Sequence, residues 1–511
     1  MANTTQRIYR TTDSITIPAG VFYVTVTTFY ENKPLLASGF NLNFKSPYHF
    51  AYGAGYNGTG ILGNGTITDS TVPVFSNPVG GTPNRFANLS AENVFGSIHG
   101  LNSTSNNSLR EITWGNGAIG YLGNGGVTNR SIPNFTALTA PLKQIKTNSG
   151  YTVLNLSNTG NVYWYGQFNA PTNTSASSPV LIVGNVKIAK ILSATLVACF
   201  LLDHNGYTYG IGNMTAGILG NGSSSGGTSS PVLVLGAGAG GYKFIKANTN
   251  FGSATNSYAL TNDNRLFGWG QNLGYLGNNT IISYSSPVLI ANNVRSFSIF
   301  DAEEVGSGAN SYAYIDLDNN AYMWGQNSVG ELGNGDLTFR SSPTLISGNL
   351  KFLKIVSNSG ATLGLTTNND LYGWGNNNTF ALGGGYSNTV KFSSPVLISS
   401  GLKFRDFFIS INMAVYAITR EGVMYAWGQN SFGELGVGST GNISTPTLVA
   451  GTWTPNFIGN SANGLSTVST QILPVNPGNT YDVLLSAGTS YFGNTPISYG
   501  EIDRIVVTYE T

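Results

Sequence analysis

Short alternating stretches of apolar and polar residues, separated by polar turns, recur along most of the chain. A representative unit contains Phe352–Val356, then Ala361–Thr366, a polar turn and Leu371–Trp374, and ends with the proline-led run Pro395–Ile398. Period-two alternation predicts β-strands, and the short polar turn predicts that the middle two strands form a hairpin. Proline suits the first residue of a strand, where no ladder donor is needed. Each unit therefore predicts four short strands.

An anchor glycine after the third predicted strand marks each copy of this unit. The copies lie 46 to 60 residues apart, and their eight anchors are Gly55, Gly115, Gly166, Gly212, Gly270, Gly325, Gly375 and Gly428. A unit of this size cannot bury both faces of its sheet alone, so neighbouring units must pack together. Radial packing gives a closed β-propeller. We favour it over a linear solenoid because the units are long and neither end carries a polar capping repeat.

The residues around the anchors form a more specific signature. The two best copies read Trp-Gly-Gln-Asn at 324–327 and 427–430, each followed by Gly-Glu-Leu-Gly and then by Ser-Pro or Thr-Pro. This combination resembles the regulator of chromosome condensation repeat family, and the resemblance covers roughly residues 35–450. It implies a propeller, which in this family has seven blades.

Two copies depart from the family pattern. The first copy is degenerate, with Ala54 before its anchor glycine, so the eight units predict either seven or eight blades. The third copy replaces the Leu-Gly-Asn-Gly turn by Phe168–Pro171, which predicts a remodelled loop on that blade.

The two ends of the chain lie outside the repeats and predict one split β domain. Residues 14–27 alternate around a Pro-Ala-Gly turn and predict a hairpin, and residues 471–511 contain further strand patterns. Neither end is large enough for a good core alone, so we expect residues 1–34 and 451–511 to pair into a β-sandwich that flanks a propeller at 35–450. The Ile-Pro-Ala-Gly-Val, Pro-Gly-x-Thr-Tyr and final Val-Thr-Tyr segments resemble glycine-rich domains of bacteriophage tail and tail-fibre proteins. The expected fold is thus all-β, with a seven- or eight-bladed propeller inserted in a split sandwich.

Composition narrows the function classes. The chain of 511 residues has 23 Lys and Arg against 22 Asp and Glu, a formal net charge of +1, and only 9% charged residues. A nucleic-acid binder would need a basic face, so we expect no nucleic-acid partner. Residues 1–10 lack the apolar segment of a secretory signal, and the longest apolar run, Ile191–Leu202, is too short for a membrane span. We therefore expect neither signal-dependent export nor membrane insertion.

The sequence offers few residues for catalysis or metal binding. The single cysteine, Cys199, lies in an apolar run and predicts a buried, inert thiol rather than a nucleophile. His204 falls in a hairpin turn, while His49 and His99 fall in predicted strands. No Ser/His/Asp or Cys/His set and no metal-ligand spacing is recognisable. We expect no catalytic, cofactor-binding or metal-ligating residues and no cofactor.

Acidic residues and tryptophans are the remaining candidates for catalysis or ligand binding. Asp316 and Asp318 occupy a position where other copies have Asn-rich turns, so a turn is favoured over a carboxylate pair that cleaves glycosides. Asp301, Glu303 and Glu304 break the repeat register, and a solvated loop is favoured for them. Six tryptophans lie at repeat anchors and are interpreted as blade-packing residues: Trp114, Trp164, Trp269, Trp324, Trp374 and Trp427.

These features favour a non-enzymatic virion structural protein, a phage tail or fibre component that displays its propeller for host attachment. It would be made in the host cytoplasm and released by lysis, with other virion proteins, a host-surface receptor or glycan, or a second copy of the chain as partners. The alternatives are an intracellular propeller interaction protein, such as a nucleotide-exchange factor, and a glycan-cleaving tail protein. Loops near Phe339, Arg340, Tyr284 and Tyr386 suit adaptable polar recognition.

Overall fold

The computed structural model contains two compact units. One comprises Phe50–Gln471, and the other combines Met1–His49 with Ile472–Thr511. Between residues 50 and 449 the structure describes all residues except 77–85, 91–96, 104–108, 148–151, 169–173, 185, 237–240, 251–254, 301–309, 411–412 and 420–422. Outside that range it describes only the strands named below.

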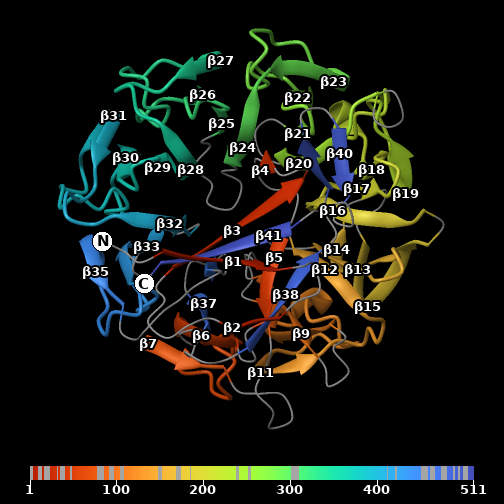
Figure 1. The fold of residues 1–511 in the computed structure, drawn as a ribbon, viewed down its shortest axis with the longest axis horizontal. Helices are drawn as coiled ribbons and strands as arrows, with labels where there is room; N and C mark the ends of the chain where they lie inside the picture. The colour runs from red at the N-terminus through yellow and green to blue at the C-terminus, as the bar shows by residue number, and fades with distance from the viewer. Residues whose placement is uncertain are drawn as a thin grey trace. The chain divides into compact units, whose positions relative to one another are not determined.

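In the described residues of the larger unit, eight antiparallel sheets of four strands follow one another around a ring (Figure 1). The first four blades are formed by β36 (Ile458–Asn460), β37 (Ser466–Ile472), β6 (His49–Gly55) and β7 (Ser70–Phe75); by β8 (Phe86–Ser90), β9 (Ser97–Ser103), β10 (Leu109–Gly115) and β11 (Arg130–Phe135); by β12 (Leu142–Thr147), β13 (Thr152–Ser157), β14 (Val162–Phe168) and β15 (Thr174–Val183); and by β16 (Ile188–Ala194), β17 (Ala198–Asp203), β18 (Thr208–Asn213) and β19 (Gly227–Leu233).

Blades 5 to 8 repeat the same arrangement. They are formed by β20 (Phe244–Asn250), β21 (Asn256–Thr261), β22 (Leu266–Gly270) and β23 (Tyr284–Ala291); by β24 (Val294–Phe300), β25 (Ser311–Asp316), β26 (Ala321–Gly325) and β27 (Arg340–Leu345); by β28 (Phe352–Asn358), β29 (Ala361–Thr366), β30 (Leu371–Asn376) and β31 (Lys391–Leu397); and by β32 (Phe404–Ile409), β33 (Ala414–Thr419), β34 (Met424–Gly428) and β35 (Ile443–Leu448). Short 3-10 turns occur at Ala118–Gly120 and Thr215–Gly217. The first strand of each blade lies nearest the centre of the ring, as β20 and β24 show in Figure 1.

The predicted all-β propeller is confirmed, and its ring has eight blades. The degenerate first copy forms a full blade because β36 and β37, from the C-terminal part of the chain, add to β6 and β7. Blade 8 then contacts blade 1, where the Gly438 amide donates to the Thr71 carbonyl at 2.8 Å. The expected propeller boundary at residue 450 therefore differs from the arrangement found, in which the compact unit continues to Gln471.

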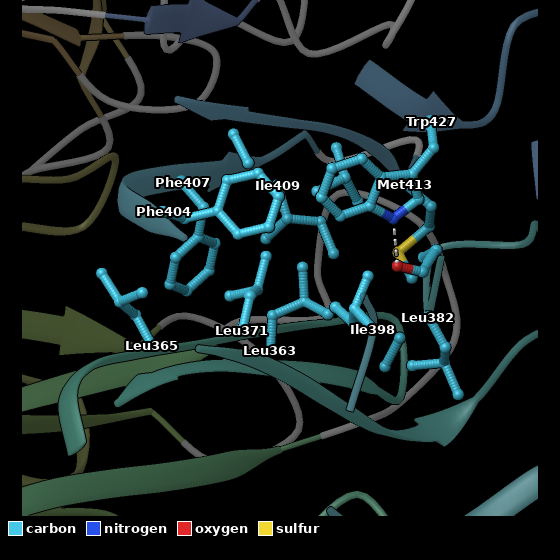
Figure 2. Close-up of a cluster of buried hydrophobic side chains, with 14 residues drawn as sticks. Leu363, Leu365, Leu371, Leu382, Ile398, Phe404, Phe407, Ile409, Met413 and Trp427 are labelled. Atoms are coloured by element: carbon cyan, nitrogen blue, oxygen red, sulfur yellow. Dashed lines mark hydrogen bonds between the residues drawn. The ribbon is translucent and has the colours of Figure 1, made fainter. Parts of the chain in front are cut away.

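Hydrophobic clusters fill the junctions between consecutive blades. Figure 2 shows the cluster between blades 7 and 8, where Leu363 and Leu371 pack against Phe404, Phe407 and Trp427. The second and third strands of a blade are covered on both faces, so every residue of β29 is buried rather than every other one. The alternation predicted from the sequence therefore reflects alternating size and polarity within a strand that is buried on both sides.

The strands of the smaller unit pair between the two chain ends. One sheet has the order β1 (Thr4–Tyr9), β41 (Arg504–Glu510), β3 (Tyr23–Tyr30) and β4 (Lys33–Pro34); another has β2 (Ser14–Thr16), β38 (Thr480–Ser486) and β5 (Asn41–Lys45); and β39 (Thr489–Phe492) pairs with β40 (Thr495–Ser498). The predicted hairpin over residues 14–27 is wrong, because β2 and β3 each pair with a C-terminal strand in a different sheet. The packing of these sheets into a sandwich stays a prediction.

At six blade junctions, a loop glycine fits under the aromatic side chain of the next blade. Gly333 has φ +66, and a Cβ there would lie 2.6 Å from Trp374 Nε1. Replacing Gly333 by Ala should lower the free energy of unfolding by about 2–4 kcal/mol, because left-handed strain and overpacking add. Chemical denaturation measures this loss. Gly401→Ala is the matched control, since nothing lies within 4 Å of a Cβ there; equal stability of the two variants would contradict the expectation.

Candidate functional site

In five blades, one asparagine side chain fixes the loop between the third and fourth strands. In blade 6, Oδ1 of the buried Asn327 accepts a hydrogen bond from the Leu332 amide at 3.0 Å. Its Nδ2 donates to the carbonyls of Asp336 at 3.0 Å and Thr338 at 3.2 Å. A single side chain therefore satisfies backbone groups at both ends of the loop, which explains why asparagine ends the Trp-Gly-Gln-Asn motif.

The same arrangement recurs in other blades. Buried asparagines that bond both a leucine amide and loop carbonyls are Asn57, Asn272, Asn377 and Asn430. Because their hydrogen bonds fix the loop backbone, side chains at the loop tips are presented in a defined arrangement at little further cost in conformational entropy.

Large apolar side chains project from these rigid loops on blades 5 and 6. Ile281 is 78% exposed, Ile282 60% and Leu337 56%. We define the blade 5–6 loop surface by its residues, which are Leu273, Tyr275, Ile281, Ile282, Leu337 and Phe339. Patches of exposed apolar side chains are typical of protein interaction sites.

The two loops touch, so they form one surface. The Phe339 ring from blade 6 meets the Tyr275 ring of blade 5 edge to face, with centroids 5.2 Å apart. It also lies over Gly274, where a Cβ would be 3.1 Å from Phe339 Cζ. At the edge of the surface, the Arg340 guanidinium forms an ion pair with Asp336. One of the candidate recognition loops, that of Phe339 and Arg340, thus belongs to this surface.

The other two candidate loops, at Tyr284 and Tyr386, lie elsewhere. Tyr284 is half-buried and packs against the clusters on both sides of blade 5. Tyr386 is half-buried on blade 7, with its ring 4.9 Å from that of Phe392. Both have a packing role that the sequence pattern did not predict.

The predicted turn residues form turns. Asp203 Oδ1 accepts the amides of Asn205 and Tyr207, both at 2.8 Å, and this places His204 at an exposed turn position. Asp316 Oδ1 accepts the Asp318 amide at 2.9 Å in the equivalent turn of blade 6. The turn interpretation is therefore confirmed for both segments.

Some candidates cannot be placed. Asp301, Glu303 and Glu304 lie outside the described residues. His49 begins β6, and the structure describes its strand but not its side chain.

The structure brings together a buried polar cluster that sequence reasoning missed. Ser97 Oγ lies 3.0 Å from His99 Nε2, and His99 Nδ1 lies 3.3 Å from Glu111 Oε1. Tyr165 from the next blade donates to Glu111 Oε1 at 2.5 Å, and Asn155 Nδ2 donates to Oε2 at 2.7 Å. The order Ser, His, Glu resembles a hydrolase triad.

All five side chains of this cluster are 0% exposed at the junction of blades 2 and 3. A substrate has no access to them, so the cluster joins two blades rather than performing chemistry. Burial, followed by the charge of Glu111, raises the pKa of Tyr165 well above its usual value. No sequence motif predicts this cluster, because its members come from four strands of two blades.

Five of the six anchor tryptophans are fully buried between blades, as expected: Trp114, Trp269, Trp324, Trp374 and Trp427. Trp164 differs because it lies two residues before its anchor glycine, whereas the other tryptophans directly precede theirs. It packs with Leu154, Ile191 and Cys199 toward blade 4. Tyr165 takes the position directly before the anchor glycine, which tryptophan holds in the other five copies.

The described residues contain no group of three or more potential metal ligands. A pocket of about 190 Å³ between blades 4 and 5 is lined by Val197, Ile218, Asn213, Gln271 and a few small residues, none of them titratable. The part of the chain that the structure describes also has no helix with the length and hydrophobicity of a membrane span.

Comparison with known families identifies the repeat. Residues 352–380 and 421–458 each match the regulator of chromosome condensation (RCC1) repeat. The chain carries RCC1 repeats. Among solved structures, it is similar to Prp20p from Saccharomyces cerevisiae, with a TM-score of 0.53, 16% identity and coverage of 86% of this chain and 97% of that chain. Human WBSCR16 has a TM-score of 0.52 and 16% identity, with 70% of this chain and 98% of that chain covered. These similarities show an RCC1-like propeller fold.

Two curated relatives share part of this RCC1-like region. The ultraviolet-B receptor UVR8 of Arabidopsis thaliana is 24% identical over 359 residues, which cover 66% of this chain and 77% of UVR8. The E3 ubiquitin-protein ligase HERC2 of Mus musculus is 26% identical over 257 residues, which cover 49% of this chain but only 5% of HERC2.

The thiol of Cys199 should be inert in the folded protein. The side chain is fully buried, and burial raises its pKa to about 12, so the nucleophilic thiolate is scarce at neutral pH. We expect no measurable reaction with an aromatic disulfide reagent at about pH 8, and complete reaction once denaturant is added. Absorbance of the released thiol measures both. Fast labelling of the native protein would contradict the buried position.

Removing the asparagine under the candidate surface should loosen its loop. Asn272→Ala deletes the bonds to the Leu276 amide and to the carbonyls of Thr280 and Ile282, and should cost about 1–3 kcal/mol of unfolding free energy. Hydrogen exchange should become faster at residues 276–283 than elsewhere. The exposed Asn292 provides the control substitution Asn292→Ala. Unchanged exchange in Asn272→Ala would show that the side chain does not fix the loop.

Proposed function

We propose that this protein is a non-catalytic propeller interaction protein that binds a partner protein through the blade 5–6 loop surface. The observation that carries the proposal is the exposure of Ile281, Ile282 and Leu337 on loops whose backbone is fixed from beneath. Apolar side chains on rigid loops bind a partner with a small loss of conformational entropy. The absence of a titratable group from the pocket between blades 4 and 5 also favours binding over catalysis.

The similarities favour the alternative of a propeller interaction protein over the virion interpretation. The relatives differ in what they do: UVR8 is a receptor, HERC2 is a ubiquitin ligase, and Prp20p has binding properties toward Gsp1p and histones. One fold therefore serves several functions, and the specific partner must be argued from this chain's own surface. Nucleotide exchange on a small GTPase is a narrower form of the same proposal.

The virion role has no support from these similarities. It rested on the terminal segments, for which the structure describes strand pairing only. Tail or fibre assembly, host attachment and release by lysis stay predictions. The glycan-cleaving alternative required a carboxylate pair, and Asp316 and Asp318 belong to a turn instead.

Charge placed on the loop surface should abolish partner binding. In the double variant Ile281→Asp/Leu337→Asp, two exposed apolar side chains become charged without a change in the core. We expect proteins captured by the wild-type chain from the source cells to be lost, with at least tenfold weaker binding once a partner is purified. Quantitative mass spectrometry and then calorimetry measure the two effects.

Leu448→Asp is the matched control, because Leu448 is also 56% exposed but lies on the outer strand of blade 8. It should retain the captured proteins. Equal capture by both variants would reject this surface. Sedimentation of the chain with purified phage particles would support the virion interpretation instead. Accelerated nucleotide release from a captured GTPase would support the narrower proposal of an exchange factor.

A further inference from the structure

The chain contains eight Asn-Gly pairs, and seven of them lie in the described residues. In such a pair the glycine has no side chain to shield its amide nitrogen, which can attack the side-chain carbon Cγ of the asparagine before it. This reaction requires the two atoms to come close in the correct orientation, so the local structure decides which pair reacts. The asparagines of the seven pairs are Asn57, Asn64, Asn116, Asn124, Asn205, Asn221 and Asn334.

Four of these pairs are held by a hydrogen bond to the next blade. In each, the glycine amide donates to a serine carbonyl of that blade at 2.7–2.8 Å. The donors are Gly65, Gly125, Gly222 and Gly335, and the acceptors are Ser131, Ser177, Ser285 and Ser393. The asparagine side chains are also held, because Oδ1 of each accepts a hydrogen bond, as Asn334 does from Asn327 Nδ2 at 3.1 Å. Both reacting groups of these four pairs are therefore fixed by other partners.

Two further pairs are held within their own loops. The buried Asn57 accepts a hydrogen bond from the Leu62 amide at 2.9 Å. Asn116 Oδ1 accepts one from the Ala118 amide at 2.9 Å, and the amide of the glycine after Asn116 donates to Asn129 Oδ1 at 3.1 Å. Neither asparagine side chain can turn toward the following nitrogen without breaking these bonds.

The seventh pair, Asn205 and Gly206, lacks these restraints. It lies in the turn between β17 and β18 of blade 4, where Asn205 is exposed. The Gly206 amide donates only within the turn, to the Asp203 carbonyl at 3.3 Å, which is longer than the amide bonds of the other pairs. In the part of the chain that the structure describes, no hydrogen bond involves the Asn205 side chain. This side chain is therefore free to rotate toward the Gly206 nitrogen.

We propose that Asn205 is a site of spontaneous deamidation in the folded protein. The Gly206 nitrogen attacks Asn205 Cγ, and the new C–N bond closes a five-membered succinimide ring. The bond from Cγ to Nδ2 breaks, and Nδ2 leaves as ammonia with the proton released by the Gly206 nitrogen. Water then adds its hydroxyl to either ring carbonyl and its proton to the ring nitrogen, which breaks that C–N bond and gives aspartate or isoaspartate. Water is the only co-reactant, and the reaction does not depend on the proposed partner.

Both products change the turn of blade 4. Each places a new carboxylate close to Asp203, and like charges repel. Isoaspartate also lengthens the backbone before Gly206 by a methylene group. Asp203 Oδ1 accepts the amides of Asn205 and Tyr207, both at 2.8 Å, and the longer backbone separates these two donors. Deamidation should therefore loosen the turn between β17 and β18.

Incubation of the full chain in mildly alkaline buffer, followed by peptide mapping with mass spectrometry, tests the site. Asn205 should deamidate at least tenfold faster than Asn64, Asn124, Asn221 or Asn334. In heavy-oxygen water the product should carry a heavy oxygen atom, because water opens the ring. In urea the same five pairs should react at similar rates, since the hydrogen bonds are lost. Equal rates in the folded chain, or no reaction at Asn205 under conditions that deamidate the chain in urea, would overturn the proposal.

Gly206→Asn is the matched variant, because blades 5 to 7 have asparagine at the same left-handed turn position, namely Asn264, Asn319 and Asn369 with φ 63 to 64. A Cβ at residue 206 would lie no closer than 3.5 Å to the Lys243 side chain, so there is room for it. The variant should keep its melting temperature but deamidate at least tenfold more slowly, because the new side chain shields the nitrogen. After incubation, the Tyr207 amide should exchange hydrogen faster in the wild type only. Equal deamidation of the two proteins would show that the Gly206 nitrogen is not the nucleophile and would reject the proposal.

Discussion

The ring depends on an indole hydrogen bond that crosses from one blade to the loop of the blade before it. At five junctions the tryptophan Nε1 donates to a buried loop carbonyl at 2.8–2.9 Å, and the acceptors are Ile61, Ile218, Tyr275, Glu331 and Ala381. The bond satisfies a polar group that would otherwise be buried without a partner, while the ring fills the junction. The glycine two residues after the acceptor, such as Gly333, leaves room for that ring.

Junctions without tryptophan use other contacts. Tyr165 takes the anchor position of blade 3, and its hydroxyl reaches Glu111, so a buried network with His99 and Asn155 replaces the indole bond. At the closing junction, Gly436 of blade 8 lies against Ala54 and Pro73 of blade 1. Ring closure is therefore achieved with small residues and with the strands β36 and β37, which join the two parts of the chain in one sheet. A closed ring leaves only short sheet edges exposed.

The same rigidity creates the surfaces available for binding. Because asparagine side chains fix the loops from beneath, residues such as Ile281 and Leu337 need no packing role and can remain exposed. On the innermost strands, Lys246 and Lys354 donate to carbonyls of the neighbouring innermost strand. The buried asparagines therefore stabilise the loops, while the exposed loop positions are free to differ between blades.

Sequence alone determined the repeat, the four-stranded unit, the buried anchor tryptophans and the inert Cys199, because each depends on a local pattern of apolar residues, turns and glycines. It also singled out the loop at Phe339 and Arg340 as a candidate, although not the exposed Ile281, Ile282 and Leu337. The tertiary structure alone decided the eighth blade, the strand pairing of the chain ends and the cluster around His99. Each of these joins residues far apart in the chain, and the periodicity of one strand carries no information about which distant strand lies beside it.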